Sequence, residues 1–161
     1  MKRVSLLLAV VLLSMATVVH AADFRIFDLR NKIFDESKAI KTLLPTSKDH
    51  YLLMVFFDSC IVVTSQIDAY FCMMGIFNAL RTEDITKEAV GYLVNWLTEM
   101  KRSNEINLKS FGEIKIPMVP ATAMHFTKLK SYFGSLGELI QADLNRMNAL
   151  LRVAKPAKTK K

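Results

Sequence analysis

One run of apolar residues constrains the fold of this chain more than any other feature. Between positions 53 and 77 the apolar side chains recur at alternating steps of three and four residues, which places them along one face of an α-helix. The run covers about three and a half heptads, a length typical of helices that pack side by side at a shallow angle. We call the following residues the core seam: Leu53, Phe56, Cys60, Val63, Ile67, Tyr70, Met74 and Phe77.

The rest of this helix divides into a polar arc and further apolar positions. Asp58, Ser65 and Asp68 lie opposite the core seam. A helix that is apolar well beyond one stripe is usually buried, so we expect it to be the central helix of the fold. A membrane span is a poor interpretation, because Asp58, Gln66 and Asp68 would each be costly in lipid without a partner. The additional apolar positions are Val55, Phe57, Ile61 and Val62.

A shorter helix is predicted before the central one, over residues 29–44. Its apolar positions follow helical spacing, and Pro45 ends it because proline cannot continue a helix. Thr46 or Ser47 can then cap the central helix by accepting a hydrogen bond from a free backbone N–H.

A third helix is predicted to start at a cap, Thr82 or Asp84, and to end near Ser103. Acidic residues at its start and basic residues at its end match the helix dipole. Residues 104–120 contain Asn, Gly and Pro and are predicted to form a long connection. The apolar positions of the third helix are Ala89, Leu93, Trp96 and Met100.

The fourth helix is predicted over residues 121–153 and is long. Gly134 and Gly137 interrupt it and indicate a close helix crossing or a bend, since each costs about 1 kcal/mol relative to Ala. Its apolar positions are Leu129, Phe133, Leu136, Ile140, Leu144, Met147 and Leu151.

Together these segments predict an all-α fold, a four-helix bundle with two long and two shorter helices. The chain has only 5 Gly and 4 Pro in 161 residues, with 52% hydrophobic residues, which favours long helices over a β fold with many turns. We expect up-down topology, since helices adjacent in sequence usually pack as neighbours. A long 104–120 connection would instead allow the third and fourth helices to be parallel.

The N-terminus has the pattern of a secretory signal peptide. Lys2 and Arg3 precede an apolar run of about a dozen residues, and small side chains at Val19 and Ala21 suit signal peptidase. We expect cleavage after Ala21, or after Ala22, with an uncleaved anchor as the alternative. The predicted organisation is a signal peptide at 1–21, the bundle domain at 22–153 and a disordered basic tail at 154–161. The mature protein would then be periplasmic or secreted.

Charge argues against nucleic-acid binding. The whole chain carries +7, and loss of Lys2 and Arg3 leaves 20 basic and 15 acidic residues, or +5. Four of those basic residues are lysines within 155–161, so the folded body carries only about +1. A nucleic-acid-binding domain would carry its positive charge as a patch on the fold. Peripheral contact of the basic tail with an anionic membrane remains an option.

The two cysteines are predicted to stay unpaired. Cys60 and Cys72 lie twelve residues apart on one predicted helix, a rise of about 18 Å. A disulfide requires Cα atoms within about 7 Å, so pairing would need a break in the helix. We expect Cys60 to be a small core residue. A bond between two chains through Cys72 is the alternative.

One pair of histidines is a weak candidate for a haem site. Outside the predicted signal peptide the chain has His50 and His125, near the starts of the second and fourth helices, and neither belongs to a His-Glu-x-x-His or Glu-x-x-His motif. In an up-down bundle both would lie at the same end, where two imidazoles could hold a haem. In a parallel arrangement they would lie at opposite ends.

Nothing in the sequence predicts catalysis. The chain has no Gly-x-Ser-x-Gly motif and no glycine-rich phosphate loop. Asp58 and Asp68 are about 15 Å apart by helical rise, too far for the paired carboxylates of glycoside hydrolysis. We therefore expect no enzyme, and assign no catalytic, cofactor-binding or metal-binding residues.

The resulting functional hypothesis is an exported interaction module. It would bind a protein partner or an apolar segment in the cell envelope, through an apolar stripe that the bundle leaves partly uncovered. The candidate residues for this stripe are Phe57, Met73, Phe77 and Tyr132. The alternative interpretation is that long helices use such side chains simply to fill a wider core. The alternative hypothesis is a ligand or haem carrier that binds within the bundle core.

Overall fold

The computed structural model describes residues 25–80 and 85–154, and these form four helices. The first is helical from residue 25 to residue 43, and it is followed by α2 (His50–Ala79), α3 (Lys87–Glu113) and α4 (Pro120–Val153). The predicted all-α helical bundle is confirmed. The predicted cleavage site at Ala21 and the lysines of the basic tail lie outside the described residues.

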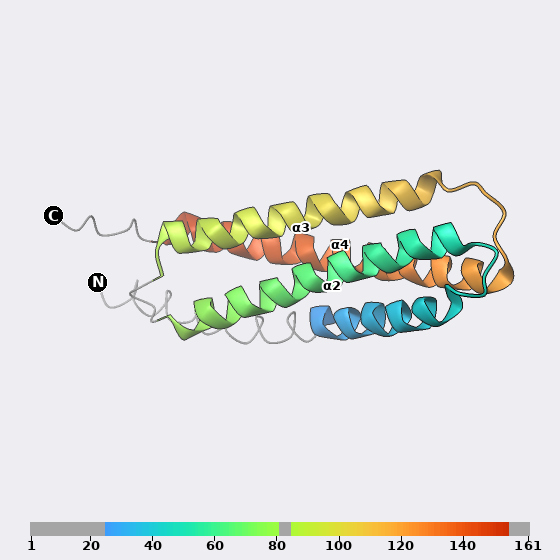
Figure 1. Cartoon of the computed structure of the whole chain (residues 1–161). Coiled ribbons are helices and arrows are strands. Elements are labelled where there is room, and N and C mark those ends of the chain that lie inside the picture. The colour runs from blue at the N-terminus through green and yellow to red at the C-terminus, as the bar shows by residue number, and fades with distance from the viewer. Residues whose placement is uncertain (1–24, 81–84, 155–161) are drawn as a thin grey trace, which may run out of the picture.

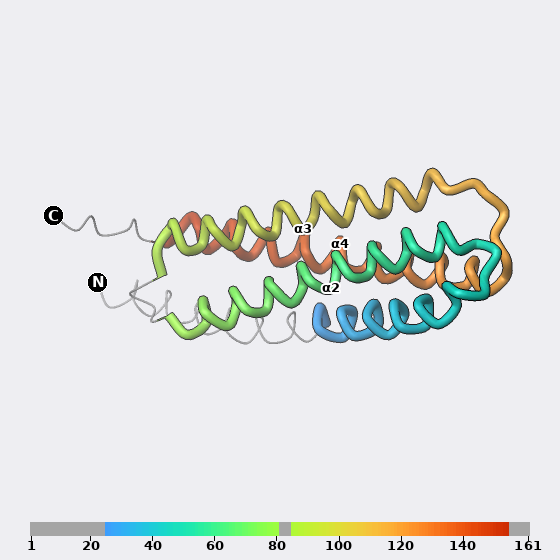
Figure 2. The backbone as a smooth tube through the Cα atoms, viewed as in Figure 1, coloured from blue at the N-terminus to red at the C-terminus, as the bar shows by residue number. Residues whose placement is uncertain are grey.

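The helices alternate in direction along a single elongated bundle (Figure 1). The turn from the 25–43 helix into α2 and the connection from α3 into α4 lie at the same end, and the backbone trace in Figure 2 shows this path clearly. α3 packs most extensively against α4, and α2 contacts both. The expected up-down topology is therefore correct, and the parallel alternative is wrong.

α2 carries the core of the bundle as its spacing predicts. Every member of the core seam is buried except Phe77, which is half-buried and packs against the core. Asp58, Ser65 and Asp68, on the predicted opposite arc, are exposed. α2 is also the one helix, among the described residues, that is long and apolar enough by composition to cross a membrane.

The start of α2 differs from the prediction. The helix begins at His50 after Asp49, rather than at a cap formed by Thr46 or Ser47. The hydroxyl of Ser47 accepts a hydrogen bond from the Asp49 N–H at 3.1 Å, so it stabilises the turn before the helix. Asp49 in turn accepts a bond from the backbone N–H of Val119 at 2.7 Å. This bond joins the two connections at that end of the bundle.

The largest correction concerns α3, which was predicted to end near Ser103 but continues to Glu113. Residues 104–113 are helical because tertiary contacts stabilise them. Asn104 is buried and its side-chain amide donates to the carbonyl oxygen of Phe133 on α4 at 2.8 Å. Phe111 is buried and stacks on the ring of Phe133, with ring centroids 5.5 Å apart. The connection is therefore short, over residues 114–119.

Two further features of α3 correct the sequence analysis. The residue that caps it is Thr86, whose hydroxyl accepts a bond from the Ala89 N–H, whereas Thr82 and Asp84 lie outside the described residues. With 30, 27 and 34 residues, α2, α3 and α4 are all long, so the expectation of two long and two shorter helices is wrong.

The buried positions of α3 also differ from the predicted ones. Leu97 is fully buried, whereas Ala89 and Trp96 are only half-buried.

Of the two glycines in α4, one marks a close helix crossing. A Cβ atom at Gly137 would lie 3.1 Å from the side-chain nitrogen of Asn104 on α3, tighter than an ordinary contact. A Cβ at Gly134 would meet nothing within 4 Å. The close-crossing interpretation therefore holds for Gly137 alone.

Candidate functional site

An apolar groove lies between the last turns of α2 and the first turns of α3. Its volume is about 230 Å³. The tyrosine hydroxyl is the only polar side-chain group among its lining residues. We call it the α2–α3 groove, and its lining residues are Met73, Ile76, Phe77, Leu80, Ala89, Tyr92 and Leu93.

Local sequence explains why this groove is open. The Thr86 hydroxyl starts α3 by accepting the N–H of Ala89, and the short side chain of Ala89 fills little of the space opposite α2. Ile76 and Tyr92, on the two helices, are 69% and 66% exposed. Apolar side chains that stand this far out of the core leave a surface that water covers at a cost.

The structure brings together only half of the residues predicted for an apolar surface. Met73 and Phe77 both line the α2–α3 groove. Phe57 and Tyr132 do not line it, although all four side chains are half-buried and pack against the core. Sequence analysis missed Ile76, although its place outside the core seam of a nearly all-apolar helix was a usable signal.

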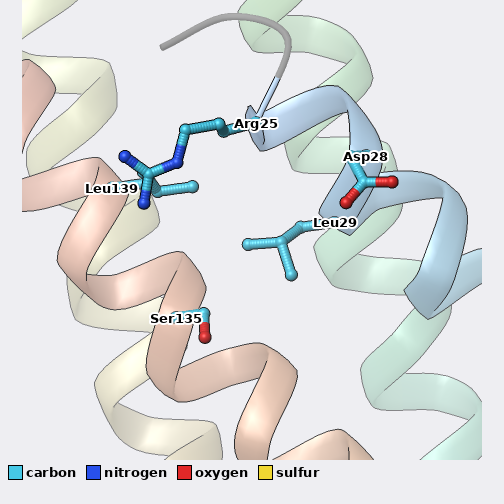
Figure 3. A pocket seen from close by; sticks show the side chains of 5 residues that line it. All are labelled: Arg25, Asp28, Leu29, Ser135 and Leu139. Carbon is cyan, nitrogen blue, oxygen red and sulfur yellow. The ribbon is translucent and has the colours of Figure 1, made fainter.

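A second cavity, of about 310 Å³, lies between the start of the 25–43 helix and α4. Its lining is mixed rather than apolar. Figure 3 shows Leu29 reaching into the gap and Arg25 extending towards Leu139, with Asp28 turned away from α4. Asp28 accepts a hydrogen bond from the ammonium of Lys32 at 2.6 Å. Asp28 is therefore paired within its own helix.

The two histidines lie at the same end of the bundle but are bound to different partners. Nδ1 of His50 donates to the carbonyl oxygen of Leu44 at 2.7 Å, and the residue is exposed. His125 is buried and its Nδ1 is hydrogen-bonded to the carboxylate of Glu36, which also accepts a bond from Lys128 at 3.4 Å. Nδ1 of each imidazole is therefore engaged with a different protein acceptor.

A buried hydrogen bond ties α2 to α4. The Tyr70 hydroxyl on α2 donates to a carboxylate oxygen of Asp143 on α4 at 2.5 Å, and that carboxylate lies 3.1 Å from the guanidinium of Arg146 on the same helix. The bond offsets the cost of burying the hydroxyl and the carboxylate in the core. Within residues 25–80 and 85–154 no cluster of three or more His, Cys, Asp or Glu side chains could hold a metal ion.

The cysteines are placed as predicted. Cys60 is fully buried in the core seam and Cys72 is exposed, and neither forms a disulfide. Burial raises the pKa of the Cys60 thiol to about 12, with a smaller contribution from the nearby Glu36 carboxylate. Cys60 is therefore a protonated, unreactive core residue.

Comparison with known proteins adds no family. The chain matches no protein-family model, no curated protein and no solved structure.

Proposed function

We propose that this protein is an exported, non-enzymatic interaction module that binds an apolar segment of a protein partner in the cell envelope at the α2–α3 groove. The observation that supports the proposal is the groove itself. Ile76, Tyr92 and their neighbours expose an apolar surface where two helices diverge, and apolar grooves between helices commonly accept the apolar face of a partner helix.

The composition of the groove also supports binding rather than chemistry. Among the described residues, its lining offers no carboxylate, imidazole or thiol that could act as a general acid, general base or nucleophile. A ligand or haem carrier is the alternative proposal. It has less support, because neither of the two cavities described above is lined by His50 or His125. An absorbance scan of the purified protein tests for haem directly.

Export is the second element of the proposal, and the signal-peptide pattern supports it. N-terminal sequencing of protein from the envelope fraction should begin at Ala22 or Asp23. An intact Met1 in a membrane pellet would contradict cleavage and favour an anchor.

The groove is tested by capturing partners from the cell envelope with the mature protein. A partner that uses the groove should be retained by the wild type and lost with Tyr92→Ala, which removes an exposed ring without touching the core. Ile106→Ala is the matched control, since Ile106 is 55% exposed on α3 but does not line the groove. Partners that survive Tyr92→Ala, or that are lost equally with Ile106→Ala, would refute the groove as the site.

A further inference from the structure

Beyond the groove, the outward-facing side of α2 is the most unusual surface of the bundle. Asp58 and Asp68 are the only charged side chains among its 30 residues. The outward side instead carries apolar residues with large exposed fractions: Tyr51 at 78%, Met54 at 44%, Ile61 at 39%, Val62 at 49% and Ile76 at 69%. We call this surface the outer face of α2.

The remaining polar groups leave this face almost without charge. Asp68 lies at its edge, where the guanidinium of Arg30 binds both carboxylate oxygens, at 2.9 and 2.8 Å. Asp58 is therefore the one acidic group directed to solvent from the face itself. By contrast, the exposed positions of α3 include Lys87, Glu88, Glu99, Arg102 and Glu105, as is usual for a solvated helix.

We infer that the outer face of α2 binds a second copy of this chain, with the two α2 helices antiparallel about a two-fold axis near Ser65. A closed two-fold contact must be self-complementary, so that each residue meets a partner at a fixed, mirrored position. For an axis at Ser65, position i of one copy faces position 130 − i of the other.

The residues of the outer face satisfy this condition. Met54 faces Ile76 of the partner subunit, and large Ile61 faces the small Ala69 of the partner subunit. Ser65, a small residue, lies at the axis, where the helices approach most closely. Such alternation of large and small side chains is what allows two helices to interdigitate.

Charge decides between antiparallel and parallel pairing. In a parallel pair the two Asp58 carboxylates would lie opposite each other, and like charges in direct contact are destabilising. In the antiparallel pair Asp58 faces the uncharged thiol of Cys72 in the partner subunit. The two carboxylates are then about 21 Å apart along the axis, from fourteen residues of helical rise.

The area available matches a small but specific interface. A helix of 30 residues is about 45 Å long and about 11 Å wide, so its outer face offers about 500 Å² per copy. Two copies would bury about 1,000 Å², which is close to the minimum for a specific association. The pairing uses the side of α2 away from the core and shares only Ile76 with the α2–α3 groove, whose other lining residues stay outside the outer face as defined above.

The first test is the mass of the mature chain in solution, by sedimentation velocity over a concentration series. We expect a mass twice that of the monomer. Ile61→Asp places a charge twice in the interface and should give a monomer at concentrations where the wild type is dimeric. Val62→Asp provides a second disrupting variant, because position 62 faces Asp68 of the partner subunit by the same rule. Ile106→Asp, on α3, is the matched control that should remain dimeric. Circular dichroism should show the same helix content in all four proteins.

The second test measures orientation with a spin label outside the outer face of α2. The label is placed at exposed position 78 in an Asn78→Cys, Cys72→Ser variant, where buried Cys60 should not react. For antiparallel helices about 8–10 Å apart, the two labelled positions should be about 40 Å from each other. A parallel pair would bring them to within about 20 Å and would overturn the proposed arrangement.

Three other results would overturn the inference altogether. They are a monomer at every concentration, a dimer unaffected by Ile61→Asp, and a monomer that binds lipid vesicles unless Ile61 is replaced by Asp. The last would assign the outer face to a membrane surface. The two proposals fail separately, because Tyr92→Ala should abolish partner capture and leave the dimer intact.

Discussion

The close crossing of α3 and α4 makes Gly137 and Gly134 a matched pair for a stability test. Both lie in the interior of α4, where glycine is less favourable than alanine by about 0.5–1 kcal/mol. At Gly134 an added Cβ meets no atom within 4 Å, so Gly134→Ala should gain this whole amount. The expected increase in melting temperature is about 2–5 °C for a domain of this size.

Gly137→Ala should behave differently, because the added Cβ would lie 3.1 Å from the side-chain nitrogen of Asn104. That nitrogen cannot retreat freely, since it donates to the Phe133 carbonyl at 2.8 Å and the residue is only 1% exposed. Breaking a buried hydrogen bond and leaving the donor unsatisfied costs about 1–3 kcal/mol. Set against the helical gain, Gly137→Ala should be destabilising by about 0–2 kcal/mol.

Urea unfolding of the two variants measures the difference, which we expect to be about 1–3 kcal/mol. A double-mutant cycle identifies its cause. In the Asn104→Ala background the obstacle is gone, so Gly137→Ala should recover the stabilisation seen for Gly134→Ala. Equal stabilisation by both single variants, or coupling between positions 104 and 137 below about 0.5 kcal/mol, would refute the reasoning.

Three further predictions follow from the core and the ends of the bundle. Ile67→Asp buries an unpaired charge at a fully buried position and should cost several kcal/mol in a thermal melt, whereas Ser65→Asp should be nearly neutral when both are measured on the monomer, at concentrations too low for the proposed pairing; equal effects would show that the helix register is wrong. Under the same dilute conditions, near pH 8 and without reductant, a thiol reagent should label Cys72 in the native protein and Cys60 only after unfolding. Reaction requires the thiolate, and the pKa of Cys60 is raised to about 12, so native labelling of both would contradict its burial. Asp49→Ala removes the bond that joins the two connections and should cost about 1–3 kcal/mol in urea unfolding, and no change would mean that this bond contributes nothing to stability.

The sequence predicted the parts of the fold that depend on local periodicity. The core seam of α2 was correct because eight apolar positions at regular spacing leave a single possible buried face. The predicted start of α4 was also correct within one residue, since proline is favourable in the first turn of a helix. Up-down topology followed from the preference of adjacent helices to pack together.

Longer-range contacts explain what the sequence could not predict. Asn104 and Gly112 have low helix propensity and suggested the end of α3, but Asn104 binds Phe133, twenty-nine residues away in sequence. Only the assembled pair of helices shows that a polar side chain at position 104 stabilises the helix. In the groove, Met73 and Phe77 were expected. No feature of the local sequence distinguishes them from Phe57, which packs against the core but does not line the groove.

The extensive packing of α3 against α4 has a kinetic consequence. These helices are neighbours in sequence with a six-residue connection, so they can pair at a low cost in chain entropy. The 25–43 helix reaches α4 through Glu36 and His125, which are 89 residues apart in sequence. We therefore expect the α3–α4 hairpin to form in the folding transition state and the contacts between the 25–43 helix and α4 to form afterwards. Substitutions at Asn104 should then slow folding, whereas Glu36→Gln should mainly speed unfolding; stopped-flow measurements showing the reverse would contradict this order.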